Sequence, residues 1–382
     1  MSIKIHRAIP VFILLFLLGA GCLQADIPMP AAPTLDATGY LLSDFHSGRI
    51  LAANSPDQRL EPASLTKIMT AYVVFHELKE GNIRLSDEVL VSENAWRTGG
   101  SRMFIEVGKR VKIEDLLKGM IIQSGNDACV ALAEHIAGSE ATFAEVMNSH
   151  AKRLGMTNTH FVNSTGLPDE NHYTTPADIA KVSAASIRDF LEYYAMYKEK
   201  EFFFNDIKQH NRNRLLWRDD SVDGIKTGHT EAAGFCLVAS AKRENMRLIS
   251  VVMGTKSEEA RAKDSLALLN YGFRFFETHQ LYGDGETINE ARIWKGAKTK
   301  LPLGVAGGLN VTIPRNQYKN LDAQLSIDPK IMAPIEQGTV VGHVIIKLED
   351  DEVANEPLVA LESISEGGLW SRLKDSFLLL FK

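Results

Sequence analysis

Residues 62–75 read Pro-Ala-Ser-Leu-Thr-Lys-Ile-Met-Thr-Ala-Tyr-Val-Val-Phe, and this stretch predicts the first long helix of the main domain. A proline near its start and Gly81 beyond its end are typical helix boundaries. Ser64 therefore lies at or near the N-terminus of the helix. Lys67 follows three residues later, so both side chains lie on one face of the helix and can touch.

Strand patterns lie on both sides of this helix in the sequence. Residues 39–54 alternate apolar and polar side chains around a His-Ser-Gly centre, which predicts a β-hairpin. Strand character returns at 224–227, 235–241 and 246–253, and the last two predict a second hairpin. A helix is predicted at 258–271. Strands before and after a helical block indicate an α/β or α+β domain whose sheet unites both ends of the segment.

The segment between these strands is mostly helical in period. Residues 111–138 are helical on both sides of Ser124-Gly125-Asn126, whose residue types favour a turn or a cap over a helix interior. An amphipathic helix is predicted at 141–154, and a loop-rich segment follows at 157–178. Three polar groups are thus expected where two helices meet.

The C-terminal part has a different sequence pattern, with short alternating segments in place of helical periods, and this predicts a small all-β domain over residues 280–366. Short alternating strands are expected, for example at 340–348 and 358–363, joined by a turn at Asp350-Asp351. The pair Gly367-Gly368 then separates this domain from a final helix. The main domain is accordingly expected over residues 26–279.

The final helix begins at Leu369 and ends at Lys382 and is amphipathic. One arc of its helical wheel is apolar: Leu369, Trp370, Leu373, Phe377, Leu380 and Phe381. Ser371, Arg372 and Asp375 face away from this arc. Such a helix rises about 21 Å, which is less than the roughly 30 Å of hydrocarbon in a bilayer. We expect it to lie in the membrane interface as an anchor; the alternative is a terminal helix docked on its own protein.

Composition and the N-terminus set the class of protein and its compartment. A chain of 382 residues with a net charge of -6 and no long basic run can form two or three domains, and nucleic acid is not an expected partner. Lys4, His6 and Arg7 precede an apolar run, which predicts a signal peptide over residues 1–25 and a secreted protein. Lipoprotein cleavage before Cys22 is an alternative.

The other two cysteines, Cys129 and Cys236, lie in apolar stretches. We interpret them as buried small hydrophobic residues, in preference to a disulfide or a catalytic thiol.

Three short motifs carry the chemistry. Ser64-x-x-Lys67 is weak by itself, since a capping serine with a surface lysine is the ordinary interpretation. A lysine drawn into a pocket of low dielectric constant can, however, lose its proton and serve as base for a serine nucleophile. The Ser124-Gly-Asn turn and a Lys226-Thr-Gly strand complete a set known from class A β-lactamases and penicillin-binding proteins.

With these motifs and their flanks the chain resembles the low-molecular-mass penicillin-binding proteins, serine-type D-alanyl-D-alanine carboxypeptidases. The flanks that carry the resemblance are residues 62–67, 123–128, 158–161, 166–168, 211–213 and 223–230. The resemblance implies a catalytic domain with the β-lactamase/transpeptidase-like fold. It also implies removal of the terminal D-alanine from peptidoglycan pentapeptides, which limits cross-linking, and acylation by β-lactam antibiotics. No cofactor and no metal are implied.

The resemblance further implies a role for each motif residue. The implied catalytic residues are Ser64 as nucleophile, Lys67 as its base, Ser124 as proton relay to the leaving amine, and Asn126 as a contact to the substrate backbone. The implied substrate-binding residues are Lys226, Thr227 and Arg261 for the terminal carboxylate, Gly228 for an unobstructed strand edge, and His229, whose backbone N–H joins that of Ser64 in an oxyanion hole. A surface ion pair is the alternative for Arg261.

Two departures distinguish the chain from a class A β-lactamase. Gly125 stands where those enzymes have aspartate, and no Glu-x-x-Leu-Asn segment precedes Lys226. β-Lactams are therefore expected to leave Ser64 slowly. The alternatives are an endopeptidase that cuts cross-linked peptidoglycan and a catalytically idle scaffold that binds wall peptides. The expected location is the periplasmic face of the inner membrane, as a peripheral protein held by residues 369–382.

Overall fold

The computed structural model describes residues 30–381, and its helices and strands lie between Gly39 and Phe381. The predicted signal peptide and Cys22 lie outside the described residues.

A five-stranded antiparallel sheet in the order β2-β1-β9-β8-β7 forms the centre of the main domain. Its strands are β1 (Gly39–Asp44), β2 (Ile50–Asn54), β7 (Val222–Thr230), β8 (Gly234–Arg243) and β9 (Met246–Thr255). The N-terminal hairpin pairs with the C-terminal one through β1 and β9, where Tyr40 lies opposite Val252. The predicted sheet that unites both ends of the segment is confirmed, and β7 is one of its two edge strands.

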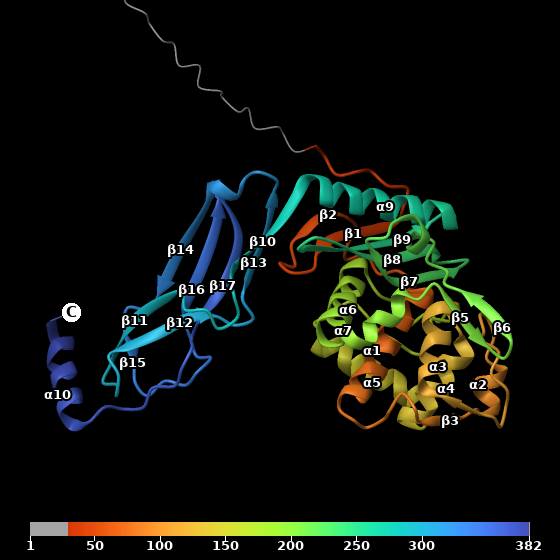
Figure 1. The fold of residues 1–382 in the computed structure, drawn as a ribbon, viewed down its shortest axis with the longest axis horizontal. Coiled ribbons are helices and arrows are strands. Elements are labelled where there is room, and N and C mark those ends of the chain that lie inside the picture. The colour runs from red at the N-terminus through yellow and green to blue at the C-terminus, as the bar shows by residue number, and fades with distance from the viewer. Residues whose placement is uncertain (1–29, 382) are drawn as a thin grey trace, which may run out of the picture. The chain divides into compact units, whose positions relative to one another are not determined.

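Both faces of this sheet are covered by helices, as Figure 1 shows. Helix α9 (Glu258–Phe275) packs on one face, where Leu42 and Leu237 join its core. The helical block packs on the other face, where Leu41 and Val238 point. Successive residues of a strand point to opposite faces, which explains why β1 is buried along its whole length.

The helical block surrounds α1 (Thr66–Lys79), which is preceded by the 3₁₀ turn η1 (Ala63–Leu65). Its other main elements are α3 (Ile113–Lys118), the π-helical turn η2 (Gly119–Gln123), α4 (Asn126–Ala137), α5 (Glu140–Arg153) and α6 (Pro176–Asp189). Smaller elements are β3 (Glu88–Leu90), α2 (Glu93–Arg97), β4 (Arg110–Lys112), α7 (Leu191–Tyr194), η3 (Ala195–Lys198), β5 (Glu201–Phe204), β6 (Ile207–His210) and α8 (Leu215–Arg218). Helix α1 is buried on nearly all sides because it has apolar side chains all round.

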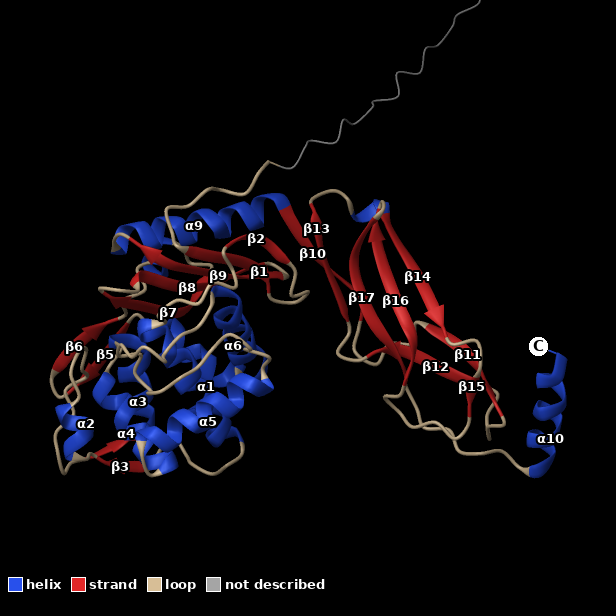
Figure 2. Cartoon of the chain, turned by 180° about the vertical axis from the view of Figure 1, so that it is seen from behind, coloured by secondary structure: helices blue, strands red, loops and turns tan. Residues whose placement is uncertain are grey.

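The C-terminal part is rich in strands, as Figure 2 shows. Strands β10 (Phe276–Tyr282) and β13 (Leu309–Pro314) pair, and a six-stranded sheet has the order β14-β16-β17-β12-β11-β15. The strands of this sheet are β11 (Asn289–Trp294), β12 (Lys300–Val305), β14 (Leu321–Ile327), β15 (Ile331–Met332), β16 (Val340–Leu348) and β17 (Asp351–Ala360), and the 3₁₀ turn η4 (Tyr318–Asn320) precedes β14.

The predicted strand at 358–363 was wrong in its extent, since β17 ends at Ala360 and begins at Asp351. Most of the first half of β17 is polar and exposed, so its pattern is not that of a half-buried strand.

The final helix α10 (Leu369–Leu378), followed by η5 (Leu379–Phe381), contacts the β domain through its polar side. Asp375 is only 5% exposed, and its carboxylate accepts hydrogen bonds from Arg292 (3.0 Å) and from the backbone N–H of Lys295 (2.6 Å). The apolar side faces solvent, with Trp370 86% exposed and Leu373 61% exposed. Among the described residues, no helix is both long and apolar enough to cross a bilayer.

Candidate active site

Ser64 lies in η1, immediately before α1, as the sequence predicted. The preceding residue, Ala63, has a φ of +47°, a conformation that non-glycine residues adopt at a cost in free energy. Two glycines contact this turn: a Cβ on Gly166 would lie 1.8 Å from the carbonyl oxygen of Ala63, and one on Gly228 would lie 3.2 Å from that of Pro62. Close packing on both sides therefore holds the nucleophile turn.

The side chain of Lys67 is 1% exposed and has three oxygen neighbours. Its Nζ lies 3.0 Å from Ser64 Oγ, 2.7 Å from Asn126 Oδ1 and 2.6 Å from the carbonyl oxygen of Thr165. The last two oxygens can only accept hydrogen bonds. A neutral amine has two N–H groups for them, and its lone pair then faces the hydroxyl of Ser64.

Burial is the main cause that lowers the pKa of Lys67 from its ordinary value, and the charge of Arg212 lowers it further. Cys129, Asp127 and Glu140 act in the opposite direction. Because burial outweighs these groups, the environment favours the neutral amine that a general base requires.

Ser124 ends the π-helical turn η2 in a left-handed conformation, with a φ of +66°. Its Oγ is buried and has no hydrogen-bond partner among the described residues. Such a group is costly unless a ligand supplies the partner. π-Helical turns of this kind often mark functional sites.

Asn126 begins α4, and its amide orientation follows from its partners. Nδ2 donates to the carbonyl oxygen of Gly99 at 2.7 Å, which leaves Oδ1 facing Lys67. The predicted junction of two helices therefore brings Ser124 and Asn126 beside the Ser64–Lys67 pair.

Asp127, a residue outside the predicted site, supports this junction. It is 1% exposed, and its carboxylate accepts hydrogen bonds from the backbone N–H groups of Met103, Phe104 and Ile105. It fixes the segment after Ser101, whose carbonyl oxygen accepts from the N–H of Asn126. An aspartate after a serine-glycine-asparagine turn at a helix start was the available signal.

The third motif lies on the edge strand β7. Lys226 is 2% exposed, and burial lowers its pKa well below the ordinary value, with the neighbouring charges of Lys67 and Arg212 adding to the effect. The missing side chain of Gly228 faces Pro62 and Leu65. Glycine at this position thus allows β7 to approach the nucleophile turn, which is a different reason from the unobstructed substrate path that we expected.

Arg261 is 4% exposed, so it is a buried arginine that lines the cavity and not a surface residue. Its Nη1 donates to the carbonyl oxygen of Gly228 at 3.2 Å, and its Nη2 lies 3.6 Å from Glu258. Arg212, which belongs to the flanking motif 211–213 and not to the predicted site, lies near both lysines.

These residues surround a cavity of about 180 Å³. It is lined by Ser64, Ser101, Ser124, Arg212, Thr227, Gly228, His229, Phe235, Glu258 and Arg261. Six of the nine predicted site residues line it, and Lys67, Asn126 and Lys226 do not. Lys67 contacts the lining residue Ser64, and Asn126 contacts Lys67. The exposed imidazole of His229 packs on Phe235 with a distance of 4.0 Å between ring centroids.

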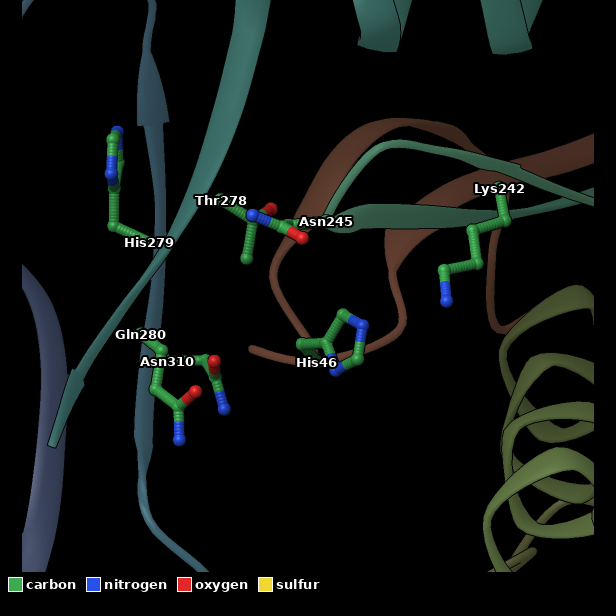
Figure 3. Close-up of a pocket in the computed structure, with 7 residues that line it drawn as sticks. All are labelled: His46, Lys242, Asn245, Thr278, His279, Gln280 and Asn310. Carbon is green, nitrogen blue, oxygen red and sulfur yellow. The ribbon is translucent and has the colours of Figure 1, made fainter. Parts of the chain in front are cut away.

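A larger cavity of about 560 Å³ lies elsewhere, and Figure 3 shows its lining. Lys242 and Asn245 come from the β8–β9 hairpin, His46 from the β1–β2 turn, and the remaining residues from β10 and β13. It contains neither a serine nor a cysteine that could act as nucleophile. The chemistry therefore belongs to the smaller cavity.

Cys129 and Cys236 are both buried and free, as predicted. Burial raises the pKa of the Cys129 thiol to about 12 and that of Cys236 to about 11. Both are poor thiolate nucleophiles, which agrees with a role in packing.

Comparisons with known proteins agree with this geometry. The profile of the peptidase S11 family, described as D-alanyl-D-alanine carboxypeptidase, matches residues 27–257, and that of the penicillin-binding protein 5 C-terminal domain matches residues 276–366. The chain is 46% identical to D-alanyl-D-alanine carboxypeptidase DacC of Escherichia coli, over 92% of this chain and 90% of that protein. It is 42% identical to DacA of the same organism, again over 92% and 90%.

Solved structures point to the same family. Penicillin-binding protein 5 from Haemophilus influenzae superimposes with a TM-score of 0.84 at 43% identity, covering 88% of this chain and 100% of that one. The two family matches together cover nearly the whole chain, as a catalytic domain followed by a β domain. Within the catalytic domain, Ser64 and Lys67 are in contact. The chain belongs to the D-alanyl-D-alanine carboxypeptidase family, peptidase S11, within the low-molecular-mass penicillin-binding proteins.

Proposed function

We propose that this chain is a serine-type D-Ala-D-Ala carboxypeptidase that removes the terminal D-alanine from peptidoglycan pentapeptide side chains and so limits cross-linking. One observation carries the proposal: a fully buried lysine, Lys67, whose nitrogen lies 3.0 Å from Ser64 Oγ while two carbonyl-type oxygens occupy its N–H groups. This arrangement suits removal of the hydroxyl proton during nucleophilic attack.

In the acylation step, Ser64 Oγ attacks the carbonyl carbon of the penultimate D-alanine and its proton passes to Lys67. The backbone N–H groups of Ser64 and His229 stabilise the oxyanion. Ser124, whose hydroxyl is unpartnered among the described residues, relays this proton: it gives its own to the nitrogen of the leaving D-alanine and takes one from Lys67, which returns to the neutral amine. The peptide bond breaks, and the shortened peptide remains as an ester of Ser64.

The substrate's terminal carboxylate is bound by Lys226, Thr227 and Arg261, and its negative charge favours the protonated form of Lys226. The substrate's backbone is held by the amide of Asn126. The position of Arg261 supports its role in carboxylate binding, because its guanidinium is buried against the carbonyl oxygen of Gly228 on β7. Water then hydrolyses the ester and frees Ser64. β-Lactams acylate the same serine and leave slowly, because Gly125 replaces an aspartate and no deacylating glutamate segment is present in the sequence.

A direct test compares the secreted form, residues 26–382, with its Ser64→Ala variant. Each is incubated with a peptide that ends in D-Ala-D-Ala, and free D-alanine is measured together with the covalent mass after penicillin is added. D-alanine release and a penicillin adduct, both lost in Ser64→Ala, are the expected results. An adduct without D-alanine release favours the endopeptidase, and neither signal favours the idle scaffold.

We further propose that residues 1–25 are a signal peptide, that residues 26–279 and 280–366 are the two domains, and that residues 367–382 hold the protein at the periplasmic face of the inner membrane. The orientation of α10 supports the anchor: Asp375 faces the protein while Trp370 and Leu373 face solvent. A helix docked by its apolar side would show the reverse. Removing residues 369–382 should release active enzyme from membranes, and a truncated protein that sediments with them would refute the anchor.

A further inference from the structure

The loop between α5 and α6 supplies one of the partners of the proposed base. Its Thr165 carbonyl oxygen lies 2.6 Å from Lys67 Nζ. The neighbouring Ser164 is held by Glu140, whose carboxylate accepts from the N–H and hydroxyl of Ser164, and by Thr70, whose hydroxyl donates to the Ser164 carbonyl at 2.6 Å. This part of the loop is therefore fastened to α1 and α5.

A buried histidine joins the same loop to the residue next to Lys67. His172 is 2% exposed, with Nδ1 3.1 Å from the backbone nitrogen of Val162 and Nε2 2.8 Å from Thr66 Oγ1. The Val162 N–H can only donate, so Nδ1 must accept and carries no proton. The neutral ring then has its proton on Nε2 and donates to Thr66 Oγ1.

Thr66 is held from a second side by the loop backbone. A Cβ on Gly166 would lie 2.9 Å from Thr66 Oγ1 as well as against Ala63. Gly166 has a φ of +83°, a conformation for which glycine is the suitable residue. The first residue of α1 is thus enclosed between His172 and the backbone that carries Thr165.

The surroundings of His172 keep this arrangement intact at neutral pH. Burial lowers the pKa of His172 to about 4; Asp169 opposes the shift, and the charges of His160 and Lys67 add to it. A protonated ring would carry a hydrogen on Nδ1 that points at the backbone N–H of Val162, so the two donors would repel each other. Phe161 closes one side, with its ring centroid 5.6 Å from that of His172.

We propose that His172 is a positioning residue for the general base: by joining Thr66 to the loop, it holds the Thr165 carbonyl against Lys67 and directs the lysine lone pair at Ser64. This inference rests on the proposed role of Lys67. Without the contact, the hydrogen bonds of Ser164 are left to hold this part of the loop, so the Thr165 carbonyl moves more freely and water reaches Nζ. Burial then lowers the pKa of Lys67 less, so the neutral base forms only at higher pH.

The test measures the second-order rate of acylation by penicillin between pH 5 and 10 in the full mature chain, with thermal unfolding alongside. In His172→Gln and in Thr66→Val, the acidic limb of the profile should move to higher pH by about one unit, which is about a tenfold loss of rate on that limb. The KM for a D-Ala-D-Ala peptide should change little. The double variant should show no further shift, since both changes remove one contact.

A matched control is His150→Gln. His150 is also buried, and burial likewise lowers its pKa to about 4, but it lies on α5 beside Arg153 and His76. The His150→Gln variant should be less stable than the parent protein, and the acidic limb of its pH–rate profile should not move. If the His172 variant does not fold, Thr66→Val alone decides, because it deletes the same hydrogen bond while keeping the side-chain shape.

An unmoved acidic limb in folded His172→Gln or Thr66→Val, or fully additive shifts in the double variant, would overturn the inference. The role of Lys67 as general base is tested separately. Undiminished acylation in Lys67→Ala would refute that role, whatever the His172 variants do.

Discussion

The side-chain nitrogen of Lys67 lies 2.7 Å from the amide oxygen of Asn126, which is 59 residues further along the chain. The amide is oriented by its second hydrogen bond, from Nδ2 to the carbonyl oxygen of Gly99. A neutral acceptor is thereby placed next to a buried amine. A carboxylate in place of this amide would raise the pKa of Lys67 and favour its protonated form.

Asn126→Asp should therefore slow acylation. A negative charge beside Nζ favours the ammonium form and raises the pKa of Lys67, so the rate at pH 7 should fall at least about tenfold and recover as pH rises. Penicillin acylation measured against pH checks this. Asn270→Asp, an exposed change of the same charge beside Arg243, is the control. An unchanged profile in Asn126→Asp would contradict the base role of Lys67.

Ser124→Ala should lower activity strongly and change stability little. The hydroxyl has no partner among the described residues, so its removal should change the free energy of unfolding by less than about 1 kcal/mol. D-alanine release should fall by about 10²- to 10⁴-fold, the usual contribution of a positioned proton donor. Ser265→Ala removes another buried hydroxyl that lacks a partner among the described residues, and it should keep full activity. Equal activity in both variants would exclude Ser124 from the reaction.

Arg261→Ala should weaken the recognition of a free C-terminal carboxylate. A lost hydrogen bond to a charged group costs about 1.5–3 kcal/mol, which is roughly a tenfold to hundredfold fall in kcat/KM. A peptide with an amidated C-terminus should be affected much less. Arg218→Ala breaks an exposed pair with Glu259 and serves as control. A fall of the same size for both peptides would indicate a structural role instead.

The stability of the folded chain should decrease as the pH falls from 6.5 to 4. Burial lowers the pKa of both His150 and His172 from 6.5 to about 4, so between these values the unfolded chain binds protons that the folded chain does not. Each histidine contributes a slope of at most about 1.4 kcal/mol per pH unit, and its stabilisation is complete above pH 6.5. Urea unfolding at several pH values checks this. The slope should be shallower in His150→Gln, and an unchanged slope would refute the assignment.

Leu373→Asp should weaken binding to vesicles that contain phosphatidylglycerol. Loss of one buried leucine costs about 2 kcal/mol, or roughly a thirtyfold weaker partition, before the cost of the new charge. D-alanine release from a soluble peptide should not change. Leu325→Asp on β14 alters another exposed leucine and should bind vesicles normally. Equal binding of both variants would locate membrane contact outside α10.

Local patterns accounted for much of the fold. The hairpin β1–β2, the helix after Ser64, the break at Ser124 and the β8–β9 hairpin were all predicted, because hydrophobic period and turn residues act over a few positions. Strand β17 was misplaced because its first half is polar on an exposed part of the sheet. Side-chain period carries no signal where neither face of a strand is buried.

The candidate site was predicted from motifs and resemblance, and the structure brings Ser64, Lys67, Ser124 and Asn126 together. The carbonyl of Thr165 could not be predicted, since every residue has a carbonyl group and only the fold selects which one meets the lysine. His172 was not identified for a similar reason. Its partners, Thr66 and Val162, lie at long or irregular separations in the sequence.

Residues close together in the chain were enough to predict the two hairpins of the main sheet, the helix after Ser64, the three motifs and the apolar arc of the final helix. The folded structure alone shows which oxygens surround Lys67, how closely Gly228 approaches the nucleophile turn, and which side of α10 faces the protein. These features depend on contacts between distant segments. Burial and distance, which the fold alone sets, decide the charge of a lysine and the partner of a carboxylate.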